Sequence, residues 1–157
     1  MHAFNDEKKR LEPTETKCQY CEIAESTDMD DNYFIPLFKE ADRTNIVVYR
    51  SVKYNKIPVG IPRCKSCQAI HQTATNKSVI LGSSFAFLII ILSFLIWDEY
   101  GFLGLLAGIL IGFGATKFIE NKLVRDKGIF TKEDGAKENE AVQDLILNGW
   151  SFTMPTA

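Results

Sequence analysis

Four cysteines are the residues of this sequence best suited to chemistry, and they fall into two closely spaced pairs. The first CxxC pair is Cys18 and Cys21. The second is Cys64 and Cys67, and 42 residues lie between the pairs. Two residues between cysteines allow a tight turn to present both thiolates to one tetrahedral metal ion. Two such pairs, with no cysteine left over, predict a closed four-thiolate site for a structural zinc ion.

Two other uses of the cysteines stay open at this point. A redox dithiol would require one CxxC pair at the start of a helix in a thioredoxin-like fold, and the β-rich segment between the pairs is too short for that fold. Two structural disulfides would require an oxidising compartment, whereas the charge pattern described below predicts the reducing cytoplasm.

His71 and an acidic segment are further candidate ligands. His71 lies four residues after Cys67, so the two side chains share a face if this part is helical. A closed site has no place for a fifth ligand, so we interpret His71 as a neighbour of the site or an interface residue, with replacement of a cysteine as the alternative. The acidic segment 22–31 lacks the spacing and central glycine of an EF-hand loop, and we expect a solvated loop there.

The segment between the cysteine pairs has the composition of β-strands. We expect strands at 33–38 and 45–54, which are rich in aromatic and β-branched residues, with a turn at 40–44. Residues 57–62 are expected to be extended, because proline restricts itself and its predecessor to extended conformations. From Cys67 onward the chain can continue as a helix.

This order, a cysteine knuckle, a β-hairpin and a second pair at the start of a helix, resembles the treble-clef and zinc-ribbon class of domains. The resemblance covers residues 18 to about 76 and implies a small β-rich domain with structural zinc. The proline and glycine usual around such knuckles are absent, since Glu22 and Gln68 follow the pairs.

Two apolar runs follow this region. Residues 79–97 contain no charge and no proline, and a helix rising about 1.5 Å per residue would make this run roughly 29 Å long, close to the hydrocarbon thickness of a bilayer. A second run, 101–119, begins after the short connector Asp98-Glu99-Tyr100. We therefore expect an antiparallel transmembrane hairpin whose turn is the connector.

Basic residues flank the predicted hairpin at one end only. They are Arg63, Lys65, Lys77, Lys117, Lys122, Arg125 and Lys127. The connector carries none, so the positive-inside rule places both termini in the cytoplasm. A four-cysteine domain followed by such a hairpin resembles small uncharacterised membrane proteins.

The second run carries a regular glycine spacing. Gly104, Gly108 and Gly112 lie on one face of a helix and allow another helix to approach closely. That neighbour is either the first helix of the same hairpin or a helix of a second copy.

The predicted fold class is α+β, in three parts. Residues 1–77 form a cytoplasmic zinc-binding domain, residues 78–119 the transmembrane hairpin and residues 120–157 a short cytoplasmic helical tail. The second helix is expected to end near Arg125, and Gly149 fits the end of a helix in the tail. The tail either docks on the zinc domain or lies on the lipid surface.

These features favour a function without catalysis. The net charge of −2 argues against nucleic-acid binding driven by bulk electrostatics, and no nucleotide loop, Ser-His-Asp pattern or HExxH motif is present. The sequence predicts a non-enzymatic integral membrane protein whose zinc module binds a protein partner or assembles with itself, with no small-molecule substrate. The alternatives are an oligomeric membrane effector or pore assembled through the glycine face, and a membrane-bound CxxC thiol oxidoreductase.

Overall fold

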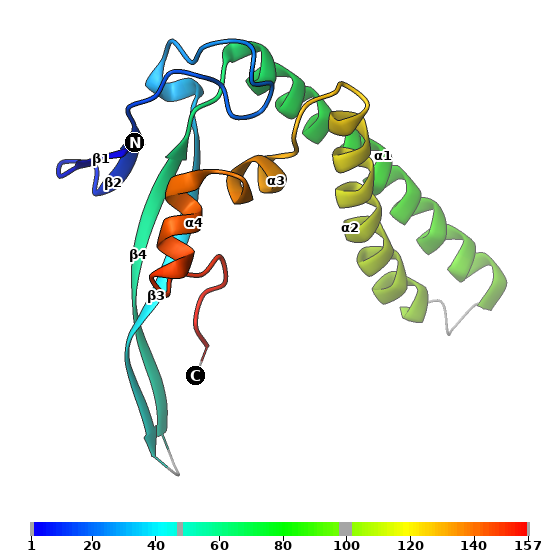
Figure 1. The fold of residues 1–157 in the computed structure, drawn as a ribbon. Coiled ribbons are helices and arrows are strands. Elements are labelled where there is room, and N and C mark those ends of the chain that lie inside the picture. The colour runs from blue at the N-terminus through cyan, green and yellow to red at the C-terminus, as the bar shows by residue number, and fades with distance from the viewer. Residues whose placement is uncertain (1, 47–48, 98–101, 157) are drawn as a thin grey trace. The chain divides into compact units, whose positions relative to one another are not determined.

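The structure is a computed structural model that describes residues 2–46, 49–97 and 102–156. Within these residues the chain is α+β, as the sequence predicts, with a four-stranded sheet and four α-helices (Figure 1). The strands are β1 (His2–Asn5), β2 (Arg10–Pro13), β3 (Tyr33–Ile46) and β4 (Tyr49–Ile61). The helices are α1 (Lys65–Trp97), α2 (Phe102–Arg125), α3 (Lys132–Lys137) and α4 (Glu140–Leu147), with one 3₁₀ turn, η1 (Met29–Asp31).

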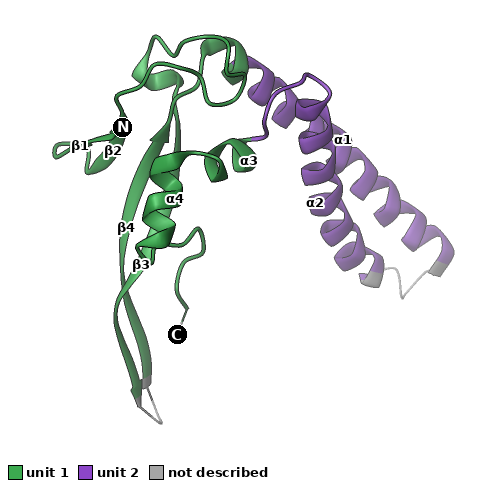
Figure 2. Cartoon of the chain, viewed as in Figure 1, with its two compact units in different colours: residues 1–68, 132–157 green, residues 69–131 purple. Residues whose placement is uncertain are grey.

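The chain divides into two compact units (Figure 2). Unit 1 contains residues 1–68 and 132–157, and therefore holds the sheet, the cysteines and helices α3 and α4. Unit 2 contains residues 69–131, which include most of α1 and all of α2. Each unit is described by itself below.

The sheet of unit 1 has the strand order β1-β2-β4-β3. β3 and β4 form a long antiparallel ribbon that pairs from Tyr33 with Ile61 to Ile46 with Tyr49. β1 and β2 form a short antiparallel hairpin, which joins β4 through the parallel pair Leu11 and Val59. The side chains of Leu37, Val59 and Ile61 are fully buried, so the core of this unit lies at the base of the ribbon.

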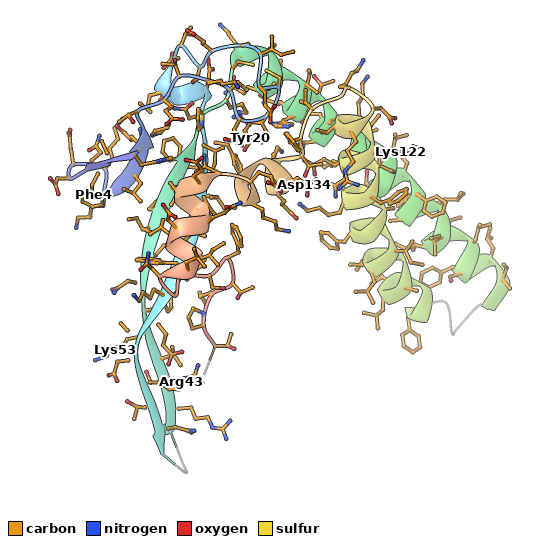
Figure 3. All side chains as sticks on the ribbon, in the orientation of Figure 1. Phe4, Tyr20, Arg43, Lys53, Lys122 and Asp134 are labelled. Carbon is orange, nitrogen blue, oxygen red and sulfur yellow. The ribbon has the colours of Figure 1, made fainter. Side chains whose placement is uncertain are left out.

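The predicted turn at residues 40–44 is wrong. These residues continue β3 and pair with β4, with one irregularity in the register between Glu40 and Asp42. Arg43, labelled in Figure 3, donates hydrogen bonds of 2.9 and 2.8 Å to the two carboxylate oxygens of Glu40. Charged residues occur here because both side chains are exposed on the ribbon, so their polarity reflects contact with solvent rather than a turn. Residues 47–48, which join the strands, lie outside the described part.

The sequence predicted one further feature of unit 1 and did not predict another. The extended conformation predicted for residues 57–62 is confirmed over the last part of β4. The hairpin of β1 and β2 was not predicted, because two four-residue strands in a charged segment give no clear alternation.

The C-terminal segment packs within unit 1. This is the first of the two predicted arrangements of the tail, docking on the domain that holds the cysteines. Phe38 of β3 and Ser151 exchange two backbone hydrogen bonds, both 2.8 Å long. Asn139 caps the start of helix α4, because its side chain accepts a hydrogen bond from the backbone N–H of Ala141, and the helix buries Val142. Gly149 follows this helix with a φ of +86°, the left-handed conformation expected of a glycine at a helix end.

Unit 2 is built on an antiparallel pair of helices with small residues at their contact. A methyl group added to Gly112 would lie 2.8 Å from the Cβ atom of Ala86, too close for an unstrained contact. The same kind of contact recurs in reverse order along the two helices, which shows that they run antiparallel. The pairs are Gly112 with Ala86, Gly108 with Ile90 and Gly104 with Ser93.

One helix among the described residues is long and apolar enough to cross a membrane, namely the Lys65–Ile96 stretch of α1. Only 11% of the most apolar part of this stretch is buried, whereas the core helix of a soluble protein is mostly buried. Helix α2 ends at Arg125, as predicted. The predicted connector Asp98-Glu99-Tyr100 and Gly101, the predicted start of the second apolar run, lie outside the described residues.

The glycine contact yields a stability test. We expect Gly112→Ala to destabilise the helix pair by roughly 1–3 kcal/mol, because the added methyl overpacks a contact that is already closed. Gly114 is the matched control, since nothing lies within 4 Å of a methyl group placed there. Thermal unfolding of the purified chain measures both variants. Equal effects at the two positions would contradict the contact.

Candidate metal centre

The four cysteines converge in unit 1. Their sulfur atoms all lie within 4.8 Å of one another, and none forms a disulfide. Cys18, Cys64 and Cys67 are buried, and Cys21 is half-buried. A tetrahedral ion with sulfur ligands at about 2.3 Å separates its ligands by about 3.8 Å, and the sulfur atoms of Cys21 and Cys64 are 3.8 Å apart. The cluster can therefore hold a metal ion.

The first pair lies in a loop shaped by backbone hydrogen bonds. The N–H of Cys18 donates to the carbonyl of Ala24 over 2.8 Å, and the N–H of Glu22 donates to the carbonyl of Cys18 over 2.9 Å. The turn is completed by Glu22, which has a φ of +58°. This left-handed conformation favours glycine, so Glu22 occupies it at an energetic cost.

Backbone contacts tie the two pairs together independently of any metal. The N–H of Cys64 donates to the sulfur of Cys18 over 3.3 Å. One residue further along the first loop, the N–H of Gln19 donates to the carbonyl of Pro62 over 2.9 Å. The end of β4 is therefore held against the first loop, and the second pair follows immediately.

The second pair lies at the start of α1. Cys64 precedes the helix, and Cys67 lies in its first turn. The N–H of Gln68 donates to the carbonyl of Cys64 over 3.0 Å, and the Ser66 hydroxyl lies 3.1 Å from the Cys64 sulfur. The backbone N–H groups at a helix start stabilise a nearby thiolate, so this position suits a metal ligand.

Burial and hydrogen bonding act on the thiols in opposite directions. Burial raises the pKa of Cys18 and of Cys67. Burial also acts to raise the pKa of Cys64, but hydrogen bonds from the Ser66 hydroxyl, from the backbone of Cys67 and with the thiols of Cys67 and Cys18 together outweigh it and lower this pKa to about 6. Cys64 is therefore the thiol of these three that carries negative charge most readily near neutral pH.

Arg63 anchors the acidic segment beside the second pair. Its Nε donates to the carbonyl of Asp31 over 2.8 Å, and its backbone N–H donates to the side-chain oxygen of Asn32 over 3.1 Å. The same Asn32 oxygen accepts a 2.7 Å hydrogen bond from the Ser26 hydroxyl. The carboxylates of this segment do not join the cluster, because the metal-competent group found among the described residues consists of the four cysteines.

His71 belongs to unit 2, one helical turn after Cys67. Its side chain is fully buried, and its Nε2 lies 3.0 Å from the carbonyl oxygen of Phe130. In the described part of the chain it is not among the residues grouped around a possible metal position. Its observed contact joins α1 to the segment that follows α2.

Comparison with known proteins gives no family for this chain. No protein-family model, curated protein or solved structure matches it. The assignment of the site therefore depends on its own geometry.

Sequence reasoning missed one residue that supports the site. Tyr20, inside the first CxxC pair and labelled in Figure 3, is only 1% exposed. A methyl group added to Gly135 of α3 would lie 2.6 Å from the Tyr20 ring. Neither residue signals the other in the sequence, since a glycine in a six-residue helix suggests only a weak helix.

The Tyr20 contact predicts that Gly135→Ala destabilises the chain by roughly 1–3 kcal/mol, because the ring must move to make room. Chemical denaturation of the intact protein measures the loss. Lys137→Ala, at an exposed position of the same helix, is the control. A gain in stability at position 135, which helix propensity alone would give, would show that Tyr20 does not depend on this glycine.

The conformation of Glu22 predicts a substitution that stabilises the chain, unlike the one at Gly135. We expect Glu22→Gly to raise stability by about 1 kcal/mol, since glycine adopts a positive φ without steric cost. Glu25→Gly removes the same charge from a neighbouring exposed residue without a positive φ, and it is expected to lower stability. Melting temperatures of the two variants decide the point. A lower value for both would refute the strain at Glu22.

Proposed function

We propose that this chain is a non-enzymatic membrane protein whose cytoplasmic domain is built on a structural zinc ion held by Cys18, Cys21, Cys64 and Cys67. The observation that carries the proposal is the convergence of four sulfur atoms within 4.8 Å, with no disulfide among them. Four thiolates favour a metal ion that accepts sulfur ligands in a tetrahedral arrangement. Zinc is such an ion, and it undergoes no redox change.

The type of site favours structure over catalysis. A catalytic zinc keeps one position open for water or substrate, whereas four cysteine ligands close the coordination sphere. The burial of three of the cysteines agrees with a closed site. The order of elements, a loop with the first pair, the ribbon of β3 and β4, and the second pair at the start of α1, supports the treble-clef-like arrangement.

Membrane anchoring by two spans is part of the proposal. α1 meets the length and polarity of a span, and α2 packs antiparallel to it within unit 2. Large apolar side chains of both helices are exposed, which water would disfavour and lipid would not. The most exposed include Leu95, Ile96, Leu110 and Phe113. The basic residues at one end of the pair support cytoplasmic termini.

A protein partner or a second copy is the proposed ligand of the zinc domain. Ile23, directly after the first knuckle, is 90% exposed, although isoleucine is usually buried. An exposed aliphatic side chain on a rigid, metal-held loop suits contact with another protein.

The alternative of a pore assembled through the glycine face has less support. Gly104, Gly108 and Gly112 contact α1 of the same chain, so this face is already used. Assembly of several copies would need a different helix face.

A membrane-bound thiol oxidoreductase is the second candidate, and one observation favours it. The pKa of Cys64 is lowered to about 6, as in CxxC pairs that react at the start of a helix. Against it, Cys64 is buried, and a reactive thiol must be reached by its substrate.

Metal analysis of the purified, membrane-extracted chain tests the zinc proposal. We expect one zinc per chain, and we expect Cys18→Ser and Cys64→Ser each to lose the metal together with the folded zinc domain, because three ligands and a small domain without metal are insufficient. Lys65→Ala is the control, since Lys65 lies between the two cysteines of the second pair, is exposed and is not a ligand. A chain that folds fully without any bound metal would overturn the proposal.

Thiol titration separates zinc binding from redox chemistry. Zinc-bound cysteines stay protected until a chelator is added, whereas a redox pair reacts at once. Immediate reaction of two thiols without chelator would favour the oxidoreductase.

A further inference from the structure

A groove with apolar walls lies within unit 2, between the first part of α1 and the last part of α2. Its volume is about 210 Å³. The walls include Ala74 and Leu123, and the Thr73 side chain also lines it. Lys77 of α1 and Lys127, just after α2, are the two charged residues of the lining. An apolar groove bordered by two ammonium groups suits a ligand that is apolar over part of its length and negatively charged at one end.

The two lysines are available to such a ligand. Both side chains are exposed, and neither takes part in an ion pair among the residues that the structure describes. The last part of α2 carries three further basic residues, Lys117, Lys122 and Arg125, whereas residues 117–127 contain two acidic ones, Glu120 and Asp126. The charge balance at this end of the helix pair is therefore positive, which attracts anions.

The position of the groove along the helices points to lipid. Lys77 comes two residues before the apolar run that begins at Val79. The corresponding ends of α1 and α2 lie side by side, because the Thr75 hydroxyl donates a 2.8 Å hydrogen bond to the Glu120 carboxylate. If the helices span a bilayer, the groove begins where the hydrocarbon ends, at the depth of the headgroups.

We propose that this groove binds an anionic phospholipid. Lys77 and Lys127 contact the phosphate, and the glycerol and upper acyl carbons pack against Ala74 and Leu123. Basic pockets between membrane helices on the cytoplasmic side recognise acidic headgroups in this way. The inference rests on the proposed membrane anchoring, since it is the adjoining bilayer that supplies the ligand.

The test uses the full chain reconstituted in bilayers of phosphatidylcholine mixed with phosphatidylglycerol. Native mass spectrometry after release reports which lipid stays bound. We expect the wild-type chain to retain phosphatidylglycerol in preference to phosphatidylcholine. Lys77→Gln and Lys127→Gln are each expected to weaken this retention roughly fivefold, the effect of losing one basic contact near a membrane.

Two further variants distinguish binding in the groove from attraction by the overall positive charge. Lys122→Gln removes an exposed lysine of α2 that does not line the groove, so it lowers the overall charge equally and is expected to weaken retention less than Lys77→Gln does (Figure 3). Thr73→Trp fills the groove without changing the charge, and it is expected to lower retention. Equal loss with Lys122→Gln, or no loss with Thr73→Trp, would overturn the proposal.

Two controls identify the ligand and isolate the underlying assumption. Soluble glycerol phosphate is expected not to displace the bound lipid, and full displacement would indicate a free-phosphate site instead. Resistance to alkaline extraction from pure phosphatidylcholine vesicles tests anchoring alone. A chain that is extracted refutes the membrane proposal, whereas a chain that stays inserted but shows no preference for phosphatidylglycerol refutes only the lipid site.

Discussion

Four thiol groups within 4.8 Å cannot all ionise beside one another unless a cation balances their charge, and unit 1 is organised around this electrostatic constraint. The first loop and the start of α1 are far apart in the chain, and the cluster brings them to one point. Two hydrogen bonds, from Cys64 to the Cys18 sulfur and from Gln19 to Pro62, hold the same two segments. The ribbon of β3 and β4, marginal as an isolated hairpin, is thereby fixed at its base.

The C-terminal segment adds to the support of this cluster. Gly135 lets α3 approach Tyr20 inside the first knuckle, and Ser151 pairs with β3 at Phe38. A small domain with few buried apolar residues gains more from such added contacts than a large one, because its core supplies little stability in reserve. The proposed zinc ion and the C-terminal segment therefore both add stability that the small apolar core of this unit does not supply.

Unit 2 follows a different physical rule. Its helices approach each other through glycine, alanine and serine, so their contact depends on close backbone packing, while large apolar side chains face outward. That arrangement is stable where the surroundings are as apolar as the side chains, and it agrees with the proposed anchoring in lipid. Where the apolar run ends, the same helix pair carries lysines and the groove that we assign to an anionic lipid.

The sequence by itself determined the features that depend on local spacing and composition. These are the two CxxC pairs, the α+β class, the extended segment before Pro62, the apolar run of α1 and the helix ends near Arg125 and Gly149. Only the tertiary structure decided the features that depend on residues distant in the chain. Residues 40–44 are strand because β4 pairs with them, although their polarity suggested a turn. Gly135 lets α3 approach the Tyr20 ring, and the packing of α1 against the end of α2 brings Lys77 and Lys127, 50 residues apart in the sequence, to the lining of one groove. Such contacts leave no local pattern, since each residue is compatible with many neighbours until the chain has folded.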